Sequence, residues 1–251
     1  MTGLPQLTIG LSLALSGLAS PAFAQGPRTP PPTEFNGDVS FVNVSGNTSI
    51  TTLNVGERFI RRMAPWEFRQ DFGAVYGKTD GTESSNLWRG SLRADYGLSA
   101  RWAIYALAAF DRNKFAGITS RFAEGVGAVH RLIATDIDQL NIEGGFQITQ
   151  QQNLDGTDDN FNSVRGATSW KHVFRPGAYF FQALEFLPNL DETKDLLVNS
   201  ETAVVAPLSS HIGMKFSYLV RFDNQPALNA TGTAPLRKTD RILSSGIQIS
   251  F

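Results

Sequence analysis

The chain has 251 residues, with 22 Lys and Arg, 23 Asp and Glu, no Cys, and a formal net charge of −1. This balance lacks the basic field that nucleic-acid binding requires, so nucleic acid is not an expected partner. The absence of Cys from the sequence excludes disulfide frameworks, thiol catalysis and thiolate metal sites.

The first 24 residues have the features of a secretory signal peptide. Residues 8–19 form an uncharged, Leu-rich run, and Ala22-Phe23-Ala24 supplies the small residues that a signal peptidase reads. The run is shorter than the roughly 20 residues that a membrane-spanning helix needs. We therefore expect a signal peptide over 1–24, a Pro-rich periplasmic tether over 25–34, and one domain over 35–251.

Beyond the tether, short segments separated by turn signals follow one another, which is typical of a transmembrane β-barrel. If the mature chain spans a membrane it must do so as a closed barrel, because it lacks an apolar segment long enough for a helix. The expected strands are 35–44, 48–62, 66–77, 86–97, 101–112, 119–132, 138–151, 160–174, 177–187, 196–206, 210–222 and 237–251. The sequence thus predicts an all-β, transmembrane antiparallel barrel of about 12 strands, whose even count puts both termini at the periplasm.

The expected connections alternate in length. Those after even strands are compact, as at 62–66 and 97–101, whereas those after odd strands are longer, as at 79–85, 153–159, 188–194 and 224–237. The tight hairpin at Ser45-Gly46-Asn47 is the exception. The long connections are expected to face outward. Their acidic residues could bind Ca²⁺ or bridge to lipopolysaccharide through divalent ions, but we favour solvated loops: Asp80, Glu83, Asp155, Asp158, Asp159, Asp191 and Glu192.

The two faces of the expected strands differ as a lipid-facing wall and a wet lumen would. In 210–222, Ile212, Met214 and Phe216 alternate with Gly213 and Lys215, and Leu219 breaks the pattern. Charged side chains of both signs are predicted to face the lumen: Glu67, Arg69, Asp71, Arg89, Arg93, Arg121, Glu143, Arg165 and Lys215. A soluble periplasmic β-sandwich would alternate as well, so alternation alone leaves that fold open.

The last eight residues resemble the signal that outer-membrane barrels present to their assembly machinery. The residues that carry this resemblance are Ser244, Gly246, Ile249 and Phe251, in a strand that alternates polar with apolar side chains. Aromatic residues near other strand ends, such as Trp66 and Trp102, suit interfacial belts. The expected partners are outer-membrane lipid, lipopolysaccharide and the barrel assembly machinery.

Three runs make the resemblance specific: 72–81 (FGAVYGKTDG), 93–102 (RADYGLSARW) and 110–117 (FDRNKFAG). With further matches from about residue 38 to the end, the chain resembles the uncharacterised family of salt-induced outer-membrane proteins, a domain-of-unknown-function β-barrel. The resemblance implies an outer-membrane barrel with no established chemistry.

An alternative is that the protein is an enzyme, a barrel that modifies or hydrolyses lipid, and the positions of its three histidines test this alternative. His130, His172 and His211 fall at strand ends expected at the periplasmic rim, and Ser169 and His172 point to opposite faces of one strand. We therefore predict no catalytic, cofactor-binding or metal-binding residue and no enzyme. A lumen of mixed charge can be a salt-bridged plug or a selective channel, and we favour charges paired across strands. The prediction is a barrel with a structural or small-solute pore role, of undetermined oligomeric state.

Overall fold

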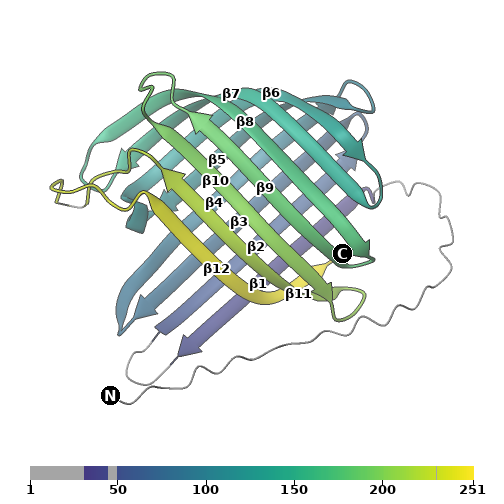
Figure 1. Cartoon of the computed structure of the whole chain (residues 1–251), viewed down its shortest axis with the longest axis horizontal. Coiled ribbons are helices and arrows are strands. Elements are labelled where there is room, and N and C mark those ends of the chain that lie inside the picture. Colours follow the sequence, from purple (N-terminus) through teal and green to yellow (C-terminus); the bar gives the residue numbers. More distant parts are fainter. Residues whose placement is uncertain (1–30, 45–49, 230) are drawn as a thin grey trace, which may run out of the picture.

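The computed structural model describes residues 31–44, 50–229 and 231–251, which form a closed antiparallel β-barrel (Figure 1). The strands follow one another around the barrel in chain order, and β1 meets β12 to close it. The predicted signal peptide, most of the predicted tether and the hairpin at Ser45-Gly46-Asn47 lie outside the described residues. Within the described ranges, no helix is both long and apolar enough to cross a membrane.

All twelve predicted strands are present. They are β1 (Thr33–Val44), β2 (Ile50–Met63), β3 (Trp66–Thr79), β4 (Thr82–Gly97), β5 (Trp102–Asn113), β6 (Ile118–Ala134), β7 (Asp138–Asn153), β8 (Asp158–Arg175), β9 (Ala178–Pro188), β10 (Leu196–Pro207), β11 (Ile212–Asp223) and β12 (Thr239–Ser250). A short 3₁₀ turn, η1 (Lys114–Ala116), joins β5 to β6. One closed sheet replaces the two facing sheets that the sandwich alternative requires, so that alternative is wrong as a fold.

Several predicted boundaries differ from the structure by two to four residues, and two of them change a predicted loop or linker. The expected loop over 79–85 is a two-residue turn, in which Asp80 and Gly81 have φ values of 50° and 77°. Positive φ at both positions is the geometry of a type I′ turn, whose twist lets the flanking strands continue to the turn. The predicted tether over 25–34 also ends too late, because Thr33 and Glu34 belong to β1 and pair with β2.

The barrel has two ends, for which we use two names. The terminal rim contains Thr33, Ser250 and the turns at 64–65, 98–101, 135–137, 176–177 and 208–211; the loop rim contains the connections at 80–81, 114–117, 154–157, 189–195 and 224–238. Among the connections that the structure describes, the predicted length asymmetry is therefore carried by the last two of the loop rim.

The longest connection reaches across the loop rim. A Cβ added at Gly117, beside η1, would lie 2.8 Å from side-chain atoms of both Ala227 and Leu236. The strands that hold these residues, β5 and β6 on one side and β11 and β12 on the other, are separated by about half of the barrel. The 224–238 segment therefore lies over the mouth at this end.

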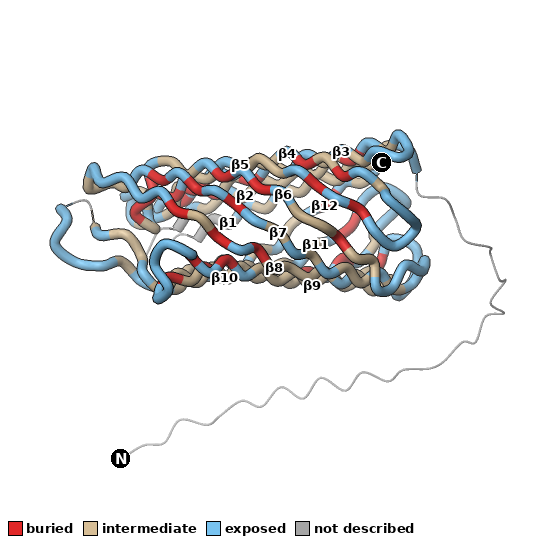
Figure 2. Tube along the Cα trace, turned by 90° about the horizontal axis from the view of Figure 1, so that it is seen from above, coloured by how far each residue is buried: buried red, intermediate tan, exposed pale blue. Residues whose placement is uncertain are grey.

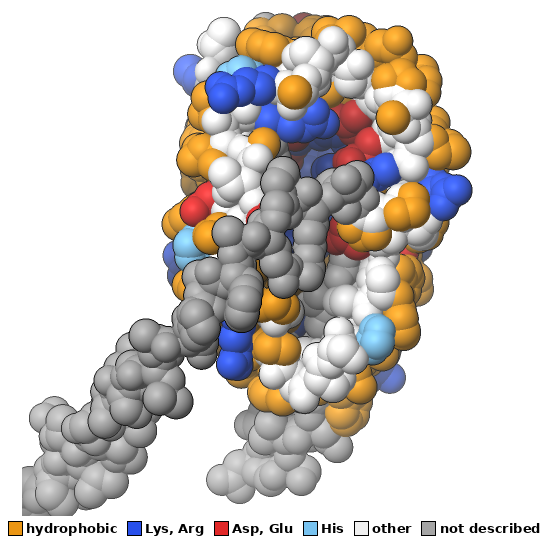
Figure 3. Space-filling view, turned by 90° about the vertical axis from the view of Figure 1, so that its right-hand side faces the viewer, with side chains coloured by type: hydrophobic (Ala, Val, Ile, Leu, Met, Phe, Trp, Pro, Cys, Tyr) orange, Lys and Arg blue, Asp and Glu red, His pale blue; other side chains and the backbone are white. Residues whose placement is uncertain are grey.

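The wall of the barrel is apolar outside and polar inside. Outward-facing Leu92 and Val126 are 62% and 60% exposed, whereas inward-facing Arg93 and Asp95 are buried. Buried positions recur along the strands in Figure 2, and Figure 3 shows hydrophobic side chains around the outside of the terminal rim and charged ones within its opening. The 12 residues of β11 rise about 3.3 Å each and, at a tilt of ~40°, span roughly 30 Å. This length matches a hydrocarbon core of about 30 Å.

Candidate functional site in the lumen

All eight residues singled out as the principal lumen-facing set project from the inner wall: Glu67, Arg69, Asp71, Arg89, Arg93, Glu143, Arg165 and Lys215. The contact between Arg93 on β4 and Glu143 on β7 identifies the inner face, because it passes over β5 and β6. Since successive strand residues alternate between faces, the ladders assign the remaining positions. Arg121, also predicted inward, lies opposite Asp111 in the β5–β6 ladder.

The centre of the inner wall holds a network that we call the central network, made of Arg93, Tyr105, Glu143, Arg165 and Glu185. Glu143 accepts hydrogen bonds from Arg93 Nη1 at 2.8 Å and from Arg165 Nη1 at 2.6 Å. Arg165 also binds Glu185 through Nε at 2.6 Å and the Tyr105 hydroxyl at 3.0 Å. The Arg93 guanidinium lies 4.1 Å from the centre of the Tyr105 ring. One carboxylate thus bridges two arginines, and one aromatic ring supports both.

Glycines on β6 and β7 make room for this network. Gly127 and Gly145 face each other in the β6–β7 ladder, and a Cβ on either would lie 2.6 or 2.5 Å from the Tyr105 hydroxyl. No side chain fits at that separation without displacing the tyrosine. The sequence therefore needs glycine at these two positions for Tyr105 to lie against the wall.

A second set of charges bridges the lumen itself. Arg221 on β11 binds Asp111 on β5 with two hydrogen bonds, of 3.1 and 2.9 Å. These strands are six apart in a twelve-stranded order, so the pair joins opposite sides of the barrel. Nearby, Asn113 on β5 donates a hydrogen bond to Asp240 on β12 at 3.3 Å. The lumen is narrowed by this bidentate pair.

The other predicted lumen charges also find partners of opposite sign. Glu67 binds Arg69 and Arg62, both at 3.0 Å. Asp71 binds Arg58 at 2.5 Å, and Lys215 binds Asp38 at 2.8 Å. Arg89 lies opposite Asp111 in the β4–β5 ladder. The ion pairs of Glu67 with Arg62, of Asp71 with Arg58 and of Lys215 with Asp38 join different strands, whereas Glu67 and Arg69 lie on the same strand.

Near the loop rim, the inner wall changes character. Phe161, Leu187 and Leu197 form a buried apolar cluster on β8, β9 and β10. Beside it, Asn189 donates a hydrogen bond to Oδ2 of buried Asp195 at 2.9 Å, and Oδ1 of Asp195 has no hydrogen-bond partner within the described residues. Near the loop rim, therefore, an apolar cluster and a carboxylate oxygen without a hydrogen bond lie where the centre of the lumen has paired charges.

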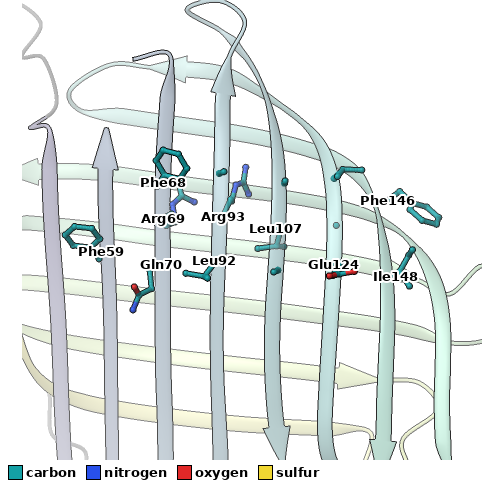
Figure 4. A pocket seen from close by; sticks show the side chains of 15 residues that line it. Phe59, Phe68, Arg69, Gln70, Leu92, Arg93, Leu107, Glu124, Phe146 and Ile148 are labelled. Atoms are coloured by element: carbon teal, nitrogen blue, oxygen red, sulfur yellow. The ribbon is translucent and has the colours of Figure 1, made fainter. Parts of the chain in front are cut away.

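A shallow apolar groove of about 690 Å³ lies on the outer wall over β2 to β7 (Figure 4). Small outward side chains form its floor and larger ones its sides: Ala94, Ala106, Ala108, Phe59, Phe68, Leu92, Val126, Phe146 and Ile148. Gln70 and Glu124 are the polar outward side chains that line it. A groove with this apolar outer lining fits hydrocarbon chains.

Sequence reasoning did not identify Tyr105, Asp111 and Glu185. Strand β5 carries apolar residues on both faces, since Ala103 and Leu107 face inward beside outward Ile104, so alternation gave no assignment there. A signal was nevertheless present, because Asp111 and Asn113 share the parity of Tyr105 and a charge on the lipid-facing side of a barrel strand is destabilising.

The three histidines lie apart at the terminal rim, each beside an aromatic ring. His130 is 4.3 Å from Trp102 and His211 is 5.3 Å from Phe251 between ring centres, while His172 binds Asp138 at 2.8 Å. No group of three His, Cys, Asp or Glu suited to a metal ion occurs in the part of the chain that the structure describes.

One Ser–His contact is present at this rim. Ser210 Oγ lies 2.8 Å from His211 Nδ1, in an exposed turn where Ser209 Oγ accepts hydrogen bonds from the backbone N–H groups of His211 and Ile212. Ser209 thus stabilises the turn, as Ser commonly does. Among the described residues, the imidazole of His211 contacts the Ser210 hydroxyl and stacks on the ring of Phe251, and no Asp or Glu side chain is hydrogen-bonded to it as a catalytic triad requires.

The four predicted assembly-signal residues divide between the two faces. Ser244 and Gly246 lie on the inner face of β12, whereas Ile249 and Phe251 lie on the outer side and are 40% and 70% exposed. Two backbone hydrogen bonds of 2.9 Å join Phe251 to Phe35 at the start of β1. The closing strands are therefore held together at the terminal rim.

A family model described as "Protein of unknown function, DUF481" matches residues 37–251. This match confirms the predicted resemblance to an uncharacterised family. No curated protein matches the chain.

Several solved barrels are similar in structure. A NanC porin is 10% identical at a TM-score of 0.47, over 86% of this chain and 97% of that one. A KdgM porin is 10% identical at a TM-score of 0.44, over 87% and 99%. The COG4313 outer membrane channel from Pseudomonas putida F1 is 11% identical at a TM-score of 0.47, over 92% and 100%.

Proposed function

The chain belongs to this family of unknown function, and from the geometry of its own barrel we propose that it is an outer-membrane pore for ions and other small hydrophilic solutes. The observation that carries the proposal is the division of the wall into an apolar outside and a charged inside. Such a wall is stable only with hydrocarbon outside and water or paired charges within.

The lumen determines which solutes are compatible with this role. Arg221 and Asp111 narrow it from opposite sides, and the central network lines β4 to β9 with both signs of charge. Large solutes do not fit past a bidentate pair that joins facing strands. Small ions and polar molecules can exchange hydrogen bonds with these side chains, which favours a narrow pore of low conductance.

In this proposal the terminal rim faces the periplasm and the loop rim faces outward. Short turns at the terminal rim and the 15-residue connection 224–238 at the loop rim support that orientation, because bacterial barrels place their long loops outside. The chain would be exported by the predicted signal peptide, inserted by the assembly machinery through its last strand, and surrounded by lipid and lipopolysaccharide.

Single-channel recording from the purified protein in planar lipid bilayers tests the proposal. We expect small, discrete conductance steps from protein that shows the heat-modifiable mobility of a folded barrel. Folded protein that produces no steps would be a salt-bridged structural barrel, and the pore would be rejected.

A further inference from the structure

The strands that close the barrel are paired over only part of their length. The β1–β12 ladder has four pairs, from Asn36↔Ser250 to Val39↔Ile247. The ladders on either side, β1 with β2 and β11 with β12, have 12 and 11 pairs. In the described part of both strands no pair joins Ser40–Val44 to Thr239–Gly246. In Figure 1, yellow β12 and purple β1 meet near the C-terminus and run to different sides at the other end.

The paired part of this seam is firmly fixed. Lys215 on β11 binds Asp38 on β1 across β12 at 2.8 Å. Asn36 Oδ1 accepts hydrogen bonds from Gln248 Nε2 at 3.1 Å and from Ser250 Oγ at 2.8 Å. The seam is thus closed from the terminal rim to the level of Asp38, and the split is confined to the part toward the loop rim.

The split lies in the lipid-facing part of the wall. Outward-facing Leu243 on β12 and Phe41 on β1 are 79% and 63% exposed, and Leu243 lies opposite Tyr218 on the apolar outer face of β11. In hydrocarbon, each backbone N–H or C=O left without a partner costs several kcal/mol. A continued register, with Phe41 opposite Ser245, would pair these backbone groups with one another. Closure of the barrel therefore does not explain why the edges of β1 and β12 are unpaired here, and we look for a functional explanation.

The inner wall beside the split differs from the rest of the lumen. Ser40, Ser217, Ser244 and Gly246 line its base, and Ser217 and Ser244 bind each other at 2.7 Å. Toward the loop rim, Leu219 and Ile242 face each other in the β11–β12 ladder. Leu219 is the residue that interrupts the alternation of its strand. On the inner face of β11 and β12, Ser217, Ser244, Leu219 and Ile242 form a strip of small or apolar side chains. The Lys215–Asp38 pair lies on one side of this strip, and Arg221 and Asp240 lie on the other.

We propose that the split between β1 and β12 is a lateral passage through which small, uncharged apolar or amphipathic solutes move between the lumen and the hydrocarbon of the membrane. An ion on this route would leave its charged partners for an uncharged strip and then for lipid. An apolar solute meets Leu219, Ile242 and Leu243 in turn, and the unpaired backbone edges offer hydrogen bonds to a polar end of such a solute. The passage rests on the membrane placement proposed above and does not depend on conduction along the lumen.

A reversible cross-link tests the passage, since the chain has no native Cys. Phe41→Cys with Ser245→Cys would close the split by a disulfide at the level where the register stops. Ala94→Cys with Ala106→Cys is the matched control, because these residues lie opposite each other on the outer face of the fully paired β4–β5 ladder, away from the split. The probe is N-phenyl-1-naphthylamine, an uncharged dye that fluoresces in hydrocarbon, added to intact cells with a lipopolysaccharide outer leaflet.

We expect wild-type cells to take up the dye faster than cells that lack the protein. Oxidation of the Phe41–Ser245 cysteine pair should lower uptake to the rate of cells without the protein, and reduction should restore it, while the control pair changes neither. Ser244→Phe, which fills the strip without a cross-link, should lower uptake in the same way. Unchanged uptake in a completely cross-linked, heat-modifiable barrel would overturn the proposal, as would wild-type uptake no faster than background. The ion conductance of the protein in planar bilayers should survive the cross-link. If the wild-type protein shows no conductance, the proposed pore is rejected, and the dye measurements alone then decide whether the passage exists.

Discussion

The shared carboxylate of Glu143 is the most informative single group to remove from the lumen. Glu143→Gln keeps the size of the side chain but removes the charge that binds Arg93 at 2.8 Å and Arg165 at 2.6 Å. All three side chains are nearly buried, with relative exposures of 12%, 8% and 10%. Breaking a buried pair by removing one partner costs about 3 to 5 kcal/mol. Because Arg93 keeps Asp95 and Arg165 keeps Glu185, we expect a loss near the lower limit, about 3 kcal/mol.

Equilibrium urea unfolding of the barrel in lipid vesicles measures this loss, with gel mobility before and after heating as the readout. Glu192→Gln is the matched control, because the same substitution then falls on an exposed side chain of the 189–195 connection at the loop rim, outside the barrel wall. We expect its effect to stay within roughly 0.5 kcal/mol of the wild type. Equal effects of the two substitutions would refute the central network as a source of stability.

Two further perturbations follow from the inner wall. Gly127→Ala places a Cβ 2.4 Å from the backbone oxygen of Gly144 and 2.6 Å from the Tyr105 hydroxyl, and it should lower the unfolding free energy by about 1 to 3 kcal/mol in the same assay. Gly144→Ala, with open space around its Cβ position, should not. A loss of stability in Gly144→Ala as large as that in Gly127→Ala would count against the packing of Tyr105 on glycine. Asp111→Ser with Arg221→Ser removes both members of the pair that joins opposite strands, and it leaves Arg89 and Arg121 without the carboxylate that lies opposite them. Because the bridge across the lumen is gone, single-channel conductance should rise. Conductance that stays at the wild-type value in this double variant would show that the pair does not limit the pore.

The fold could be predicted from the sequence because alternation, turn residues and the even strand count all favour one architecture. Strand β11 is an example, with outward Met214 and Phe216 against inward Lys215 and Ser217. The turn at Asp80-Gly81 was missed because its polar surroundings, 79–85, resemble a loop, although the Asp-Gly pair is itself a tight-turn signal.

The site was predictable in part for a physical reason. Alternation indicates which side of a strand a charge occupies, and the structure has Arg93, Glu143 and Arg165 in contact on the inner wall. It does not show which charges meet, because the partners depend on barrel size and stagger. The Arg221–Asp111 pair joins residues 110 apart in sequence, and no local pattern reports such a contact. The incomplete seam depends on the pairing of the first strand with the last, which the sequence does not show, although the alternation of β12 breaks at Ile242-Leu243 and Ser244-Ser245, where β12 has no partner on β1.

The central claim is that one face of each strand meets water and the other meets lipid, and a cysteine scan along β11 tests it most directly. The chain has no native Cys, so each position from 212 to 223 can be labelled alone with a water-soluble, membrane-impermeant thiol reagent after reconstitution. The account predicts labelling of period two, with reaction at inward positions such as Lys215 and Ser217 and protection at outward positions such as Met214 and Phe216. Uniform labelling of both faces, or labelling of the outward positions alone, would contradict it.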